Sequence, residues 1–378
     1  MTINRPDVVI PQTDPRAGYL AERTVIDTAI ARVLEAGVYI LGREVETFEA
    51  AFAGFVGVTH AVGVGNGTDA IEIALRACEI GSGDLVFTVS HTAVATIAAI
   101  ERAGATPVLI DVAPGTYTMA PGELSSALKS PPAGRPAAVL PVHIYGQPAE
   151  LSALTEIARA YGLRLIEDCA QSHGALYRGT AVGSFGDIAC FSFYPTKNLG
   201  ALGDAGVTAT NDASLAIALR EIREYGWRER YVSAIPGINT RLSPIQAAIL
   251  GAKLPHLAAD NARRRAIATR YDQGLSELPL RLPRHSGDAT HVYHQYVVRS
   301  PARDALRAQL GGACIGTGIH YPVPVHLQPA YRGRLAEFPA GLPETTQAAG
   351  EILSLPIYPQ LADPAIQRVI EALTSFFC

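Results

Sequence analysis

Short apolar runs and amphipathic segments alternate along the first half of the chain. The apolar runs predict strands at 60–67, 84–90, 106–112, 137–146 and 163–170. The segments between them, with apolar residues three or four positions apart, predict helices at 68–81, 91–105 and 150–162. Nearly unbroken apolar strands separated by helices are typical of βαβ units, in which helices cover both faces of a mostly parallel sheet. The pattern therefore predicts an α/β fold.

The second half of the chain has a different pattern. Residues 242–278 predict one long helical stretch, and 294–300, 302–310 and 364–376 predict a smaller α+β unit. We place a domain boundary near residue 250. It separates a large domain, 1–250, from a small C-terminal domain, 251–378.

The composition indicates which compartment and which classes of partner to expect. The chain has 378 residues and is 48% hydrophobic, which is enough for a large core. Its net charge of −4 argues against a surface for nucleic acid, and no stretch without charge or proline is long enough to cross a bilayer. Residues 1–16 lack the apolar segment of a signal peptide, and the five scattered cysteines fit a reducing compartment. We therefore expect a cytoplasmic protein that binds neither membranes nor nucleic acid.

One of the few lysines has unusual neighbours. The chain uses lysine only at 129, 197 and 253, and Lys197 lies between the apolar run 188–195 and the glycine-rich run 198–206. An apolar surrounding lowers the pKa of an amine from about 10.4 and makes it a nucleophile for carbonyl carbons. The glycines would let the backbone approach a ligand closely. An exposed loop lysine is the ordinary alternative.

Other polar residues follow predicted strands, at the edge of the sheet where ligands of α/β proteins bind. Asp168 ends one strand and Gln171 follows it, although an aspartate here also commonly caps a helix. Gly67 and Thr68 open a helix whose free amides suit a phosphate, although plain N-capping would look the same. Ser192, five residues before the lysine, is a second phosphate donor candidate.

Together these groups predict a site for pyridoxal 5′-phosphate. The helix start would hold the phosphate, the carboxylate would keep the ring nitrogen protonated, and the lysine would hold the aldehyde. Four histidines lie on separate segments without the spacing of a zinc site, so we expect no metal; they are His143, His173, His320 and His326. The dinucleotide-binding glycine fingerprint is missing, which argues against a nicotinamide dehydrogenase.

Many motifs in one order resemble the DegT/DnrJ/EryC1/StrS sugar aminotransferases, a family of fold-type I, aspartate aminotransferase-like transferases. The similarity covers almost the whole chain and includes "GNGTDA" (65–70), "SHTAVATIAAI" (90–100), "IEDCAQSHGA" (166–175), "FSFYPTKNLGALGDAG" (191–206) and "HYPVPVHLQPAY" (320–331). It implies a large domain with a mostly parallel sheet and a smaller C-terminal α+β domain.

The resemblance also implies roles for residues. Lys197 would form the Schiff base and move protons, Asp168 would pair with the ring nitrogen, and Gln171 with the ring hydroxyl. Gly67, Thr68 and Ser192 would hold the phosphate. The family's dimers share their sites, so Asn239 would reach the phosphate of the neighbouring subunit of a homodimer. The sugar-nucleotide pocket would be lined by Arg241, His320 and Tyr321.

The same resemblance points to a substrate. Lysine at 197, where one branch of the family has histidine and dehydrates its substrate, implies transamination. Asp204 stands where enzymes that aminate C4 carry glutamate, so we expect amination at C3 of a dTDP-3-keto-6-deoxyhexose, with L-glutamate as donor. Ala93 departs from the family, because many members place there an aromatic residue that stacks on the cofactor. Either a neighbour such as His91 shapes that side, or the ring is covered less tightly.

Two alternatives stay open. The enzyme could instead aminate a C4-keto sugar, a cyclitol ketone or an aminobenzoate precursor. The protein could also bind the cofactor as an accessory or regulatory protein without turnover, although the intact lysine, acid and phosphate loop argue against this.

Overall fold

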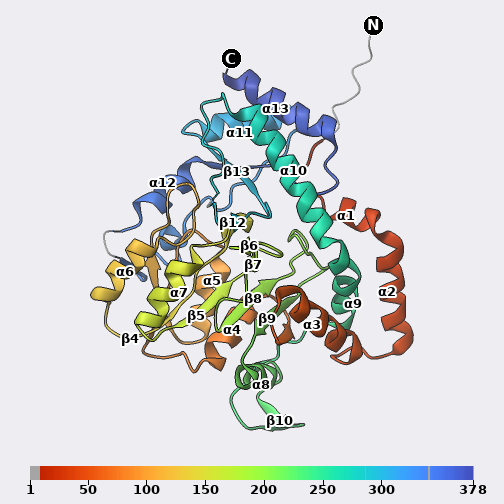
Figure 1. The fold of residues 1–378 in the computed structure, drawn as a ribbon, viewed down its shortest axis with the longest axis vertical. Coiled ribbons are helices and arrows are strands. Elements are labelled where there is room, and N and C mark those ends of the chain that lie inside the picture. The colour runs from red at the N-terminus through yellow and green to blue at the C-terminus, as the bar shows by residue number, and fades with distance from the viewer. Residues whose placement is uncertain (1–8, 286, 339–340, 378) are drawn as a thin grey trace.

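A computed structural model describes residues 9–285, 287–338 and 341–377, and its centre is an eight-stranded sheet (Figure 1). The strands follow the order β1-β9-β8-β5-β4-β2-β3-β14. In that order they are His60–Val64, Gly206–Thr210, Ile188–Ser192, Arg164–Asp168, Arg135–Val139, Asp84–Val89, Thr106–Ile110 and Ala336–Phe338. Only β9 runs antiparallel to its neighbours β1 and β8. The α/β class and the mostly parallel sheet are therefore as predicted.

Helices such as α3 and α4 pack on the two faces of this sheet, and others lie beyond it. The helices of the described residues are α1 Pro15–Ala21, α2 Arg23–Ala36, α3 Arg43–Val56, α4 Gly67–Ala77, α5 Val94–Arg102, α6 Pro121–Lys129, α7 Leu151–Ala160, α8 Ala213–Ile222, α9 Pro244–Lys253, α10 Leu257–Leu275, α11 Arg303–Gly312, α12 Pro343–Glu351 and α13 Asp363–Phe377. Short 3-10 turns occur at Ile144–Gly146, Leu254–His256 and Val325–Leu327.

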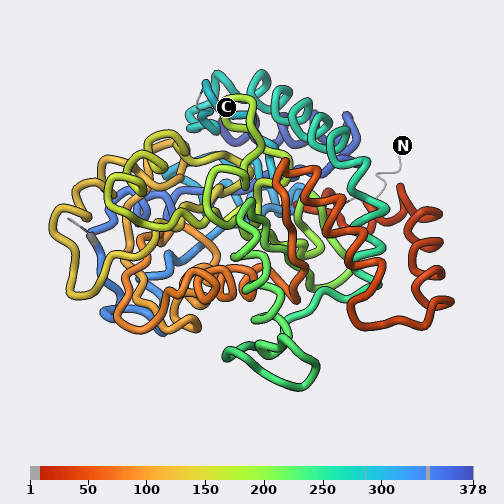
Figure 2. Tube along the Cα trace, turned by 60° about the horizontal axis from the view of Figure 1, so that its bottom comes forward, coloured from red at the N-terminus to blue at the C-terminus, as the bar shows by residue number. Residues whose placement is uncertain are grey.

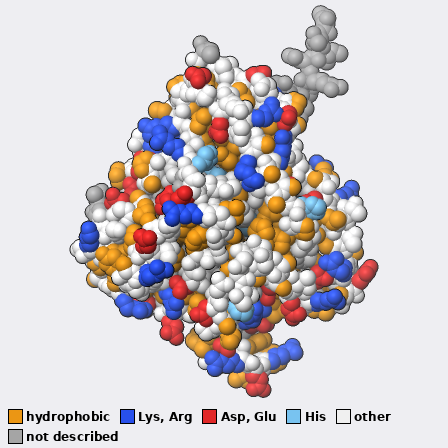
Figure 3. All heavy atoms as spheres, viewed as in Figure 1, with side chains coloured by type: hydrophobic (Ala, Val, Ile, Leu, Met, Phe, Trp, Pro, Cys, Tyr) orange, Lys and Arg blue, Asp and Glu red, His pale blue; other side chains and the backbone are white. Residues whose placement is uncertain are grey.

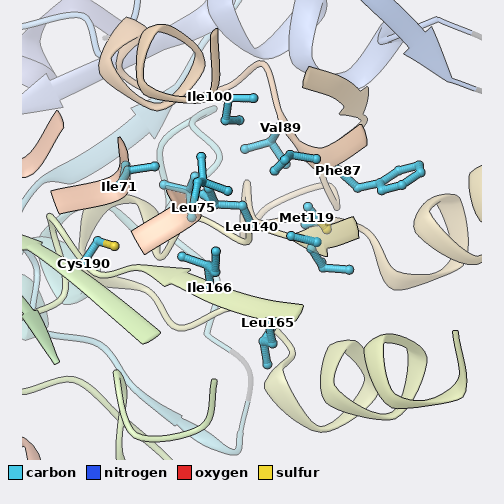
Figure 4. Packing of buried hydrophobic residues seen from close by; sticks show 14 of the residues in the cluster. Ile71, Leu75, Phe87, Val89, Ile100, Met119, Leu140, Leu165, Ile166 and Cys190 are labelled. Carbon is cyan, nitrogen blue, oxygen red and sulfur yellow. The ribbon is translucent and has the colours of Figure 1, made fainter. Parts of the chain in front are cut away.

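Successive residues of β8 belong to two different apolar clusters. Cys190 joins Ile71 and Leu75 of α4 in the cluster of Figure 4, whereas Ala189 and Phe191 join residues of α3 and α9. Because neighbouring side chains of a strand point to opposite faces, the two clusters lie on opposite sides of the sheet. Burial on both faces is the reason that these strands are apolar throughout.

A third apolar cluster forms above the sheet from α10, α11, α13 and the antiparallel pair β13 (Tyr296–Arg299) and β15 (Ile352–Leu355) (Figure 1). Strand β14, which is also C-terminal in sequence, pairs with β3 in the large sheet. Small strands complete the fold: β6 Leu176–Tyr177, β7 Thr180–Ala181, β10 Trp227–Glu229, β11 Val232–Ser233 and β12 Ala289–Thr290. The domain boundary near residue 250 stays a prediction.

The single long helix expected at 242–278 is wrong in detail. The chain forms α9 and α10 with a 3-10 turn, Leu254–His256, between them, and Pro255 lies in that turn. Proline has no amide hydrogen, so the regular helix cannot continue through it. Two predictions fall partly outside the described residues. Residues 1–8 are half of the segment examined for a signal peptide, and Cys378 is one of the five cysteines. The other four cysteines are free thiols.

One face of the molecule carries charged side chains of both signs (Figure 3). On the face in Figure 3, basic and acidic side chains are interspersed with apolar ones. None of the helices in the described part of the chain combines the length and the hydropathy that spanning a membrane requires. The hairpin β10–β11 projects from the body of the protein at the end of α8, as both Figure 1 and Figure 2 show.

Replacing Phe52 with alanine should reduce the free energy of unfolding by about 3–5 kcal/mol, measured by urea denaturation. Phe52 is fully buried and its ring contacts those of Phe191 and Phe193, at centroid distances of 4.9 and 5.2 Å, behind the strand that leads to Lys197. Phe55→Ala is the matched control, because this neighbouring ring is only partly buried. Equal losses in the two variants would contradict the packing described here.

Candidate active site

A cavity of about 270 Å³ opens at the carboxyl ends of β5 and β8. The start of α4 forms one wall and the start of α5 another. Its lining includes six of the residues predicted from the sequence to form the cofactor site: Gly67, Thr68, Asp168, Gln171, Ser192 and Lys197. Residues that are up to 130 positions apart in the sequence therefore face one space, as expected for strand ends at a common sheet edge.

One end of the cavity is suited to an anion. Helix α4 begins at Gly67, and its cap is Asn66, whose side-chain oxygen accepts the amide of Asp69 at 2.9 Å; Thr68 therefore does not cap this helix. The amides of Gly67 and Thr68 lie in the first turn and have no carbonyl partner within the helix. Ser192 lies beside them, and a Cβ at Gly67 would come within 2.6 Å of Ser192 Cβ. Only glycine lets the helix start approach the strand this closely.

Asp168 is buried beside this helix start. Its side chain is 4% exposed, and its two oxygens accept hydrogen bonds from the amide of Ala170 at 3.1 Å and from the Thr96 hydroxyl at 2.9 Å. Burial raises the pKa of this carboxyl, while the two hydrogen bonds and the nearby Lys197 amine act in the opposite direction. These partners favour an ionised carboxylate that faces the cavity.

Lys197 reaches the cavity from the turn that follows β8. Burial lowers the pKa of its amine to about 8, and the attraction of Asp168 limits the decrease. Near neutral pH the amine is still mostly protonated, but its reactive unprotonated fraction is far larger than that of a lysine in water. The ordinary alternative, a loop lysine surrounded by water, does not describe this side chain.

Four hydrogen bonds fix the turn that carries Lys197. The amide of Lys197 donates to the carbonyl of Tyr194 at 2.8 Å. The next residue, Asn198, donates to Asn261 on α10 at 2.8 Å and to the carbonyl of Val292 at 2.9 Å. Lys253 donates its ammonium to the carbonyl of Gly200. The lysine is thus attached to helices α9 and α10 and to the 292 loop.

The glycines after Lys197 have a different use from the one expected. A Cβ at Gly200 would lie 2.4 Å from the carbonyl oxygen of Pro195, and one at Gly206 would lie 2.5 Å from the backbone of Asn66. The close approach at these positions is therefore to the chain's own backbone, and it brings the lysine turn and the start of α4 together.

Gln171 belongs to a set of contacts that reaches the C-terminal part of the chain. The side-chain oxygen of Gln171 accepts a hydrogen bond from the amide of Tyr145 at 2.7 Å. The side-chain NH₂ group therefore points the other way, and it donates to the Tyr321 hydroxyl at 3.2 Å. The Tyr145 hydroxyl in turn donates to the carbonyl of His320. His320 and Tyr321, predicted to line the substrate pocket, therefore lie beside the cavity, held by Tyr145 and Gln171.

The side of the cavity near Ala93 has no aromatic ring in the predicted place. Ala93 and Ala95 line it together with Thr92 and Thr96. His91, considered as a replacement, does not line the cavity: its ring contacts those of Tyr117 and Tyr145, and its Nε2 lies 2.7 Å from the Tyr145 hydroxyl. The small alanine side chains leave this wall open.

Asn239 and Arg241 do not line the cavity of their own chain. Asn239 is exposed and pairs through its backbone with Glu224, and Arg241 lies 3.6 Å from the Glu224 carboxylate. Between them, Thr240 accepts the amide of Gly65 at 2.9 Å, which connects this segment to the start of α4. Their predicted roles, which require a second subunit, stay predictions.

A buried group with metal-ligand chemistry, His143, Glu167 and Cys169, lies behind the sheet edge. The amide of Ala149 donates to His143 Nδ1 at 3.0 Å, so the proton is on Nε2, which donates to Glu167 at 3.1 Å. Glu167 also accepts amides of Gly183, Phe185 and Gly186 at 2.8–3.0 Å. Hydrogen bonds thus occupy the ring nitrogens and both carboxylate oxygens.

Comparison with known proteins identifies the chain. The model of the DegT/DnrJ/EryC1/StrS aminotransferase family matches residues 21–374. The chain belongs to this family. It is 46% identical, over 96% of its length and 95% of the relative, to the dTDP-3-amino-3,4,6-trideoxy-alpha-D-glucose transaminase of Streptomyces venezuelae. It is 44% identical, over 97% of its length and 99% of the relative, to the dTDP-3-amino-3,6-dideoxy-alpha-D-galactopyranose transaminase of Aneurinibacillus thermoaerophilus.

The structural comparison agrees. The crystal structure of S. venezuelae DesV in complex with a ketimine intermediate matches with a TM-score of 0.93 at 45% identity, and the match covers 97% of this chain and 98% of that one. The family and the aspartate aminotransferase-like fold expected from the sequence motifs are confirmed.

Sequence reasoning missed the residues that hold the predicted ones in place. Thr96 bonds to Asp168, and Thr92 bonds to Thr96. The amide of Tyr145 bonds to Gln171. Threonines near a helix start and a tyrosine after a strand are common everywhere, so their types gave no signal. Tyr145 also has a positive φ of 60°, a conformation that residues other than glycine rarely adopt. No pattern in the sequence predicted it.

Tyr145→Phe should reduce the free energy of unfolding by about 1–3 kcal/mol, because it removes a buried hydroxyl and leaves the His320 carbonyl without its donor. Urea denaturation of the purified protein measures the change. Tyr161→Phe, at an exposed position directly after the last residue of α7, is the control and should change little. A Tyr145→Phe protein as stable as the control would contradict the arrangement.

Competitive acylation of the cofactor-free protein over a range of pH should give Lys197 a midpoint near 8, as burial lowers the pKa of its amine. Asp168→Asn should lower the midpoint further, because the carboxylate favours the protonated amine. Mass spectrometry of the labelled peptide measures both values. A midpoint at the pKa of lysine in water, or an upward change in Asp168→Asn, would contradict the geometry.

Proposed function

We propose that the protein is a pyridoxal-phosphate-dependent aminotransferase that transfers an amino group from L-glutamate to the C3 ketone of a dTDP-3-keto-6-deoxyhexose. The observation that carries the proposal is one cavity that combines a helix N-terminus, a buried carboxylate and a lysine whose pKa burial lowers to about 8. This donor set fits the cofactor. An anion site suits its phosphate, a carboxylate its protonated ring nitrogen, and an amine its aldehyde.

Six of the lining residues have a role in this proposal. The amides of Gly67 and Thr68 and the hydroxyl of Ser192 would bind the phosphate, and Asp168 would bind the ring nitrogen. Gln171 has one N–H beyond its bond to Tyr321, and that hydrogen would be donated to the ring oxygen. Lys197 would hold the cofactor through its amine.

The protonated pyridine ring, when bound, draws electrons from the carbon that carries the amino group. The chain's own residues would then move protons. Lys197, as a free amine, would remove the proton from the substrate carbon and would return it during transfer to the keto sugar. A pKa near 8 lets the same amine act as base and acid near neutral pH. Asp168, as a carboxylate, would keep the ring nitrogen protonated.

The choice of a 3-keto sugar rests on the relatives. Both transaminases described above carry names that specify dTDP-linked 3-amino sugars. Asp204, on the cavity wall, is the residue that the motif comparison associates with C3 amination. His320, Tyr321 and Arg241 would line the sugar-nucleotide pocket. Amination at C4, or of a cyclitol ketone, is the competing substrate class, and binding of the cofactor without turnover is the competing function.

We also propose a cytoplasmic homodimer with shared sites. Asn239 is exposed and lies outside its own chain's cavity, as a residue that serves a neighbouring site would. Exposed apolar side chains that a partner would cover include Tyr194 in the cavity lining and Leu202 in the turn after Lys197. Others lie on or beside the hairpin β10–β11: Tyr225, Tyr231 and Val232. Four free cysteines suit a reducing compartment.

The purified protein with pyridoxal phosphate should be yellow and should lose its visible band when L-glutamate is added. Lys197→Ala should lack the lysine-linked chromophore and lose activity by at least about 100-fold, because no other group can take its proton-transfer role. Absorption spectra and assay of 2-oxoglutarate measure these changes. Lys129→Ala, exposed on α6, is the control and should keep both properties. A normal chromophore in Lys197→Ala would refute the assignment.

In the reverse reaction, a panel of dTDP- and UDP-linked 3-amino and 4-amino sugars should show the highest kcat/KM with a dTDP-linked 3-amino-3,6-dideoxysugar. A preference for a 4-amino sugar would support the competing substrate class. Absence of any half-reaction, even with glutamate, would support the accessory function.

Hybrid dimers test the shared site. Lys197→Ala and Asn239→Ala subunits should each be impaired alone, and mixing them should restore activity, because one site of the hybrid then has neither defect. Mixing Lys197→Ala with Ser192→Ala, both in the cavity of the same chain, is the comparison. If sites are shared as proposed, it restores nothing, because each of its two sites keeps one defect. Equal recovery in both mixtures would refute a role for Asn239 across the interface.

A further inference from the structure

A row of two threonine hydroxyls ends on Asp168, and neither was identified from the sequence. Thr96, in the first turn of α5, places its hydroxyl 2.9 Å from Asp168 Oδ2. The hydroxyl of Thr92, one turn earlier, lies 2.8 Å from that of Thr96. Both threonines are almost fully buried, with Thr92 3% and Thr96 1% exposed, and both line the cavity.

The chemistry of the acceptor sets the direction of the row. An ionised carboxylate only accepts hydrogen bonds, so the single hydroxyl hydrogen of Thr96 is directed to Asp168. The oxygen of Thr96 is then free to accept, and Thr92 donates to it. Donation from Thr92 polarises the Thr96 hydroxyl and strengthens its bond to the carboxylate.

The carboxylate depends on few partners. Asp168 receives one backbone amide, from Ala170 on Oδ1, and one side-chain hydroxyl, from Thr96 on Oδ2. It is 4% exposed, so with a ring bound in the cavity water would have little room to replace a lost partner. Each oxygen thus has one fixed donor, and the two donors together set the plane of the carboxylate and the direction in which its remaining lone pairs face the cavity.

The wall beside the threonines makes this orientation more important. Ala93 and Ala95 line the cavity where a large ring could otherwise press a bound heterocycle into place. With a wall of methyl groups, packing constrains the tilt and position of such a ring weakly. Its position then depends more heavily on the bond between its nitrogen and Asp168.

Building on the proposed function, we propose that Thr96, supported by Thr92, is a positioning residue that holds Asp168 ionised and directed at the ring nitrogen of the cofactor. Thr96 itself does not react. Its effect is transmitted through Asp168, so it should disappear when Asp168 can no longer carry a charge.

Titration of the cofactor-free protein with pyridoxal phosphate, followed by visible absorption, tests this directly. Thr96→Val keeps the shape and removes the donor, and should raise the Kd about tenfold or more, the usual effect of losing a hydrogen bond to a buried charge. Thr96→Ser keeps the hydroxyl and should stay within about twofold of the wild type. The visible band of the bound cofactor should change position in Thr96→Val and not in Thr96→Ser.

A double-mutant cycle separates this role from a merely structural one. In an Asp168→Asn background, Thr96→Val should change the Kd less than about twofold, because the charge that it acts on is gone. A full tenfold effect in that background, or equal losses in Thr96→Val and Thr96→Ser, would refute the proposal. Thr92→Val should weaken binding about threefold and Thr92→Ser should not; this pair decides the question if Thr96→Val does not fold.

The two levels of inference fail differently. A wild-type protein that does not form the Lys197-linked chromophore would refute the proposed function. A wild-type protein that forms it normally, with a Thr96→Val variant of unchanged affinity and spectrum, would refute only the role of Thr96.

Discussion

An amine and a carboxylate of opposite charge face one small cavity to which water has limited access. Burial destabilises the charged form of each, lowering the pKa of Lys197 and raising that of Asp168, while each charge stabilises the other. This balance leaves the lysine able to lose its proton near neutral pH and the aspartate able to keep its charge. The chemistry proposed for the site requires both states at the same pH.

The neighbouring residues preserve that balance. Burial lowers the pKa of the fully buried His173 to about 3, and that of the partly buried His320 to about 4, so both rings are neutral near neutral pH. They fill space near Lys197 without adding a second positive charge that would compete for Asp168. The start of α4, in the lining of the same cavity, adds a helix dipole that favours a phosphate.

Packing from distant parts of the chain holds these groups at fixed positions. Asn198 bonds to α10, and Gln171 bonds through Tyr145 and Tyr321 to the segment at 320–321. Glycines at 67, 200 and 206 remove the side chains that would separate these backbones. The site therefore forms only when the C-terminal half has packed against the large sheet, and its geometry is a property of the whole fold.

The sequence alone determined the class of the fold and the main members of the site. Apolar strands separated by helices specify a sheet covered on both faces, and such a sheet brings strand ends such as Asp168 and Ser192 to one edge. The motifs around Gly67 and Lys197 added the family. These inferences succeed because they depend on periodicity and on residues that follow one another in the chain.

Only the tertiary structure decided what holds those members and which cavity each one faces. Thr96 contacts Asp168 across 72 positions, and Tyr145 contacts Gln171 across 26. Arg241 and Asn239, the second of which was predicted to serve the neighbouring subunit, lie outside the cavity of their own chain. A hydroxyl or an amide gains its role from the group it meets in space, and hydrogen bonds act over about 3 Å, a distance that no linear spacing of residue types specifies.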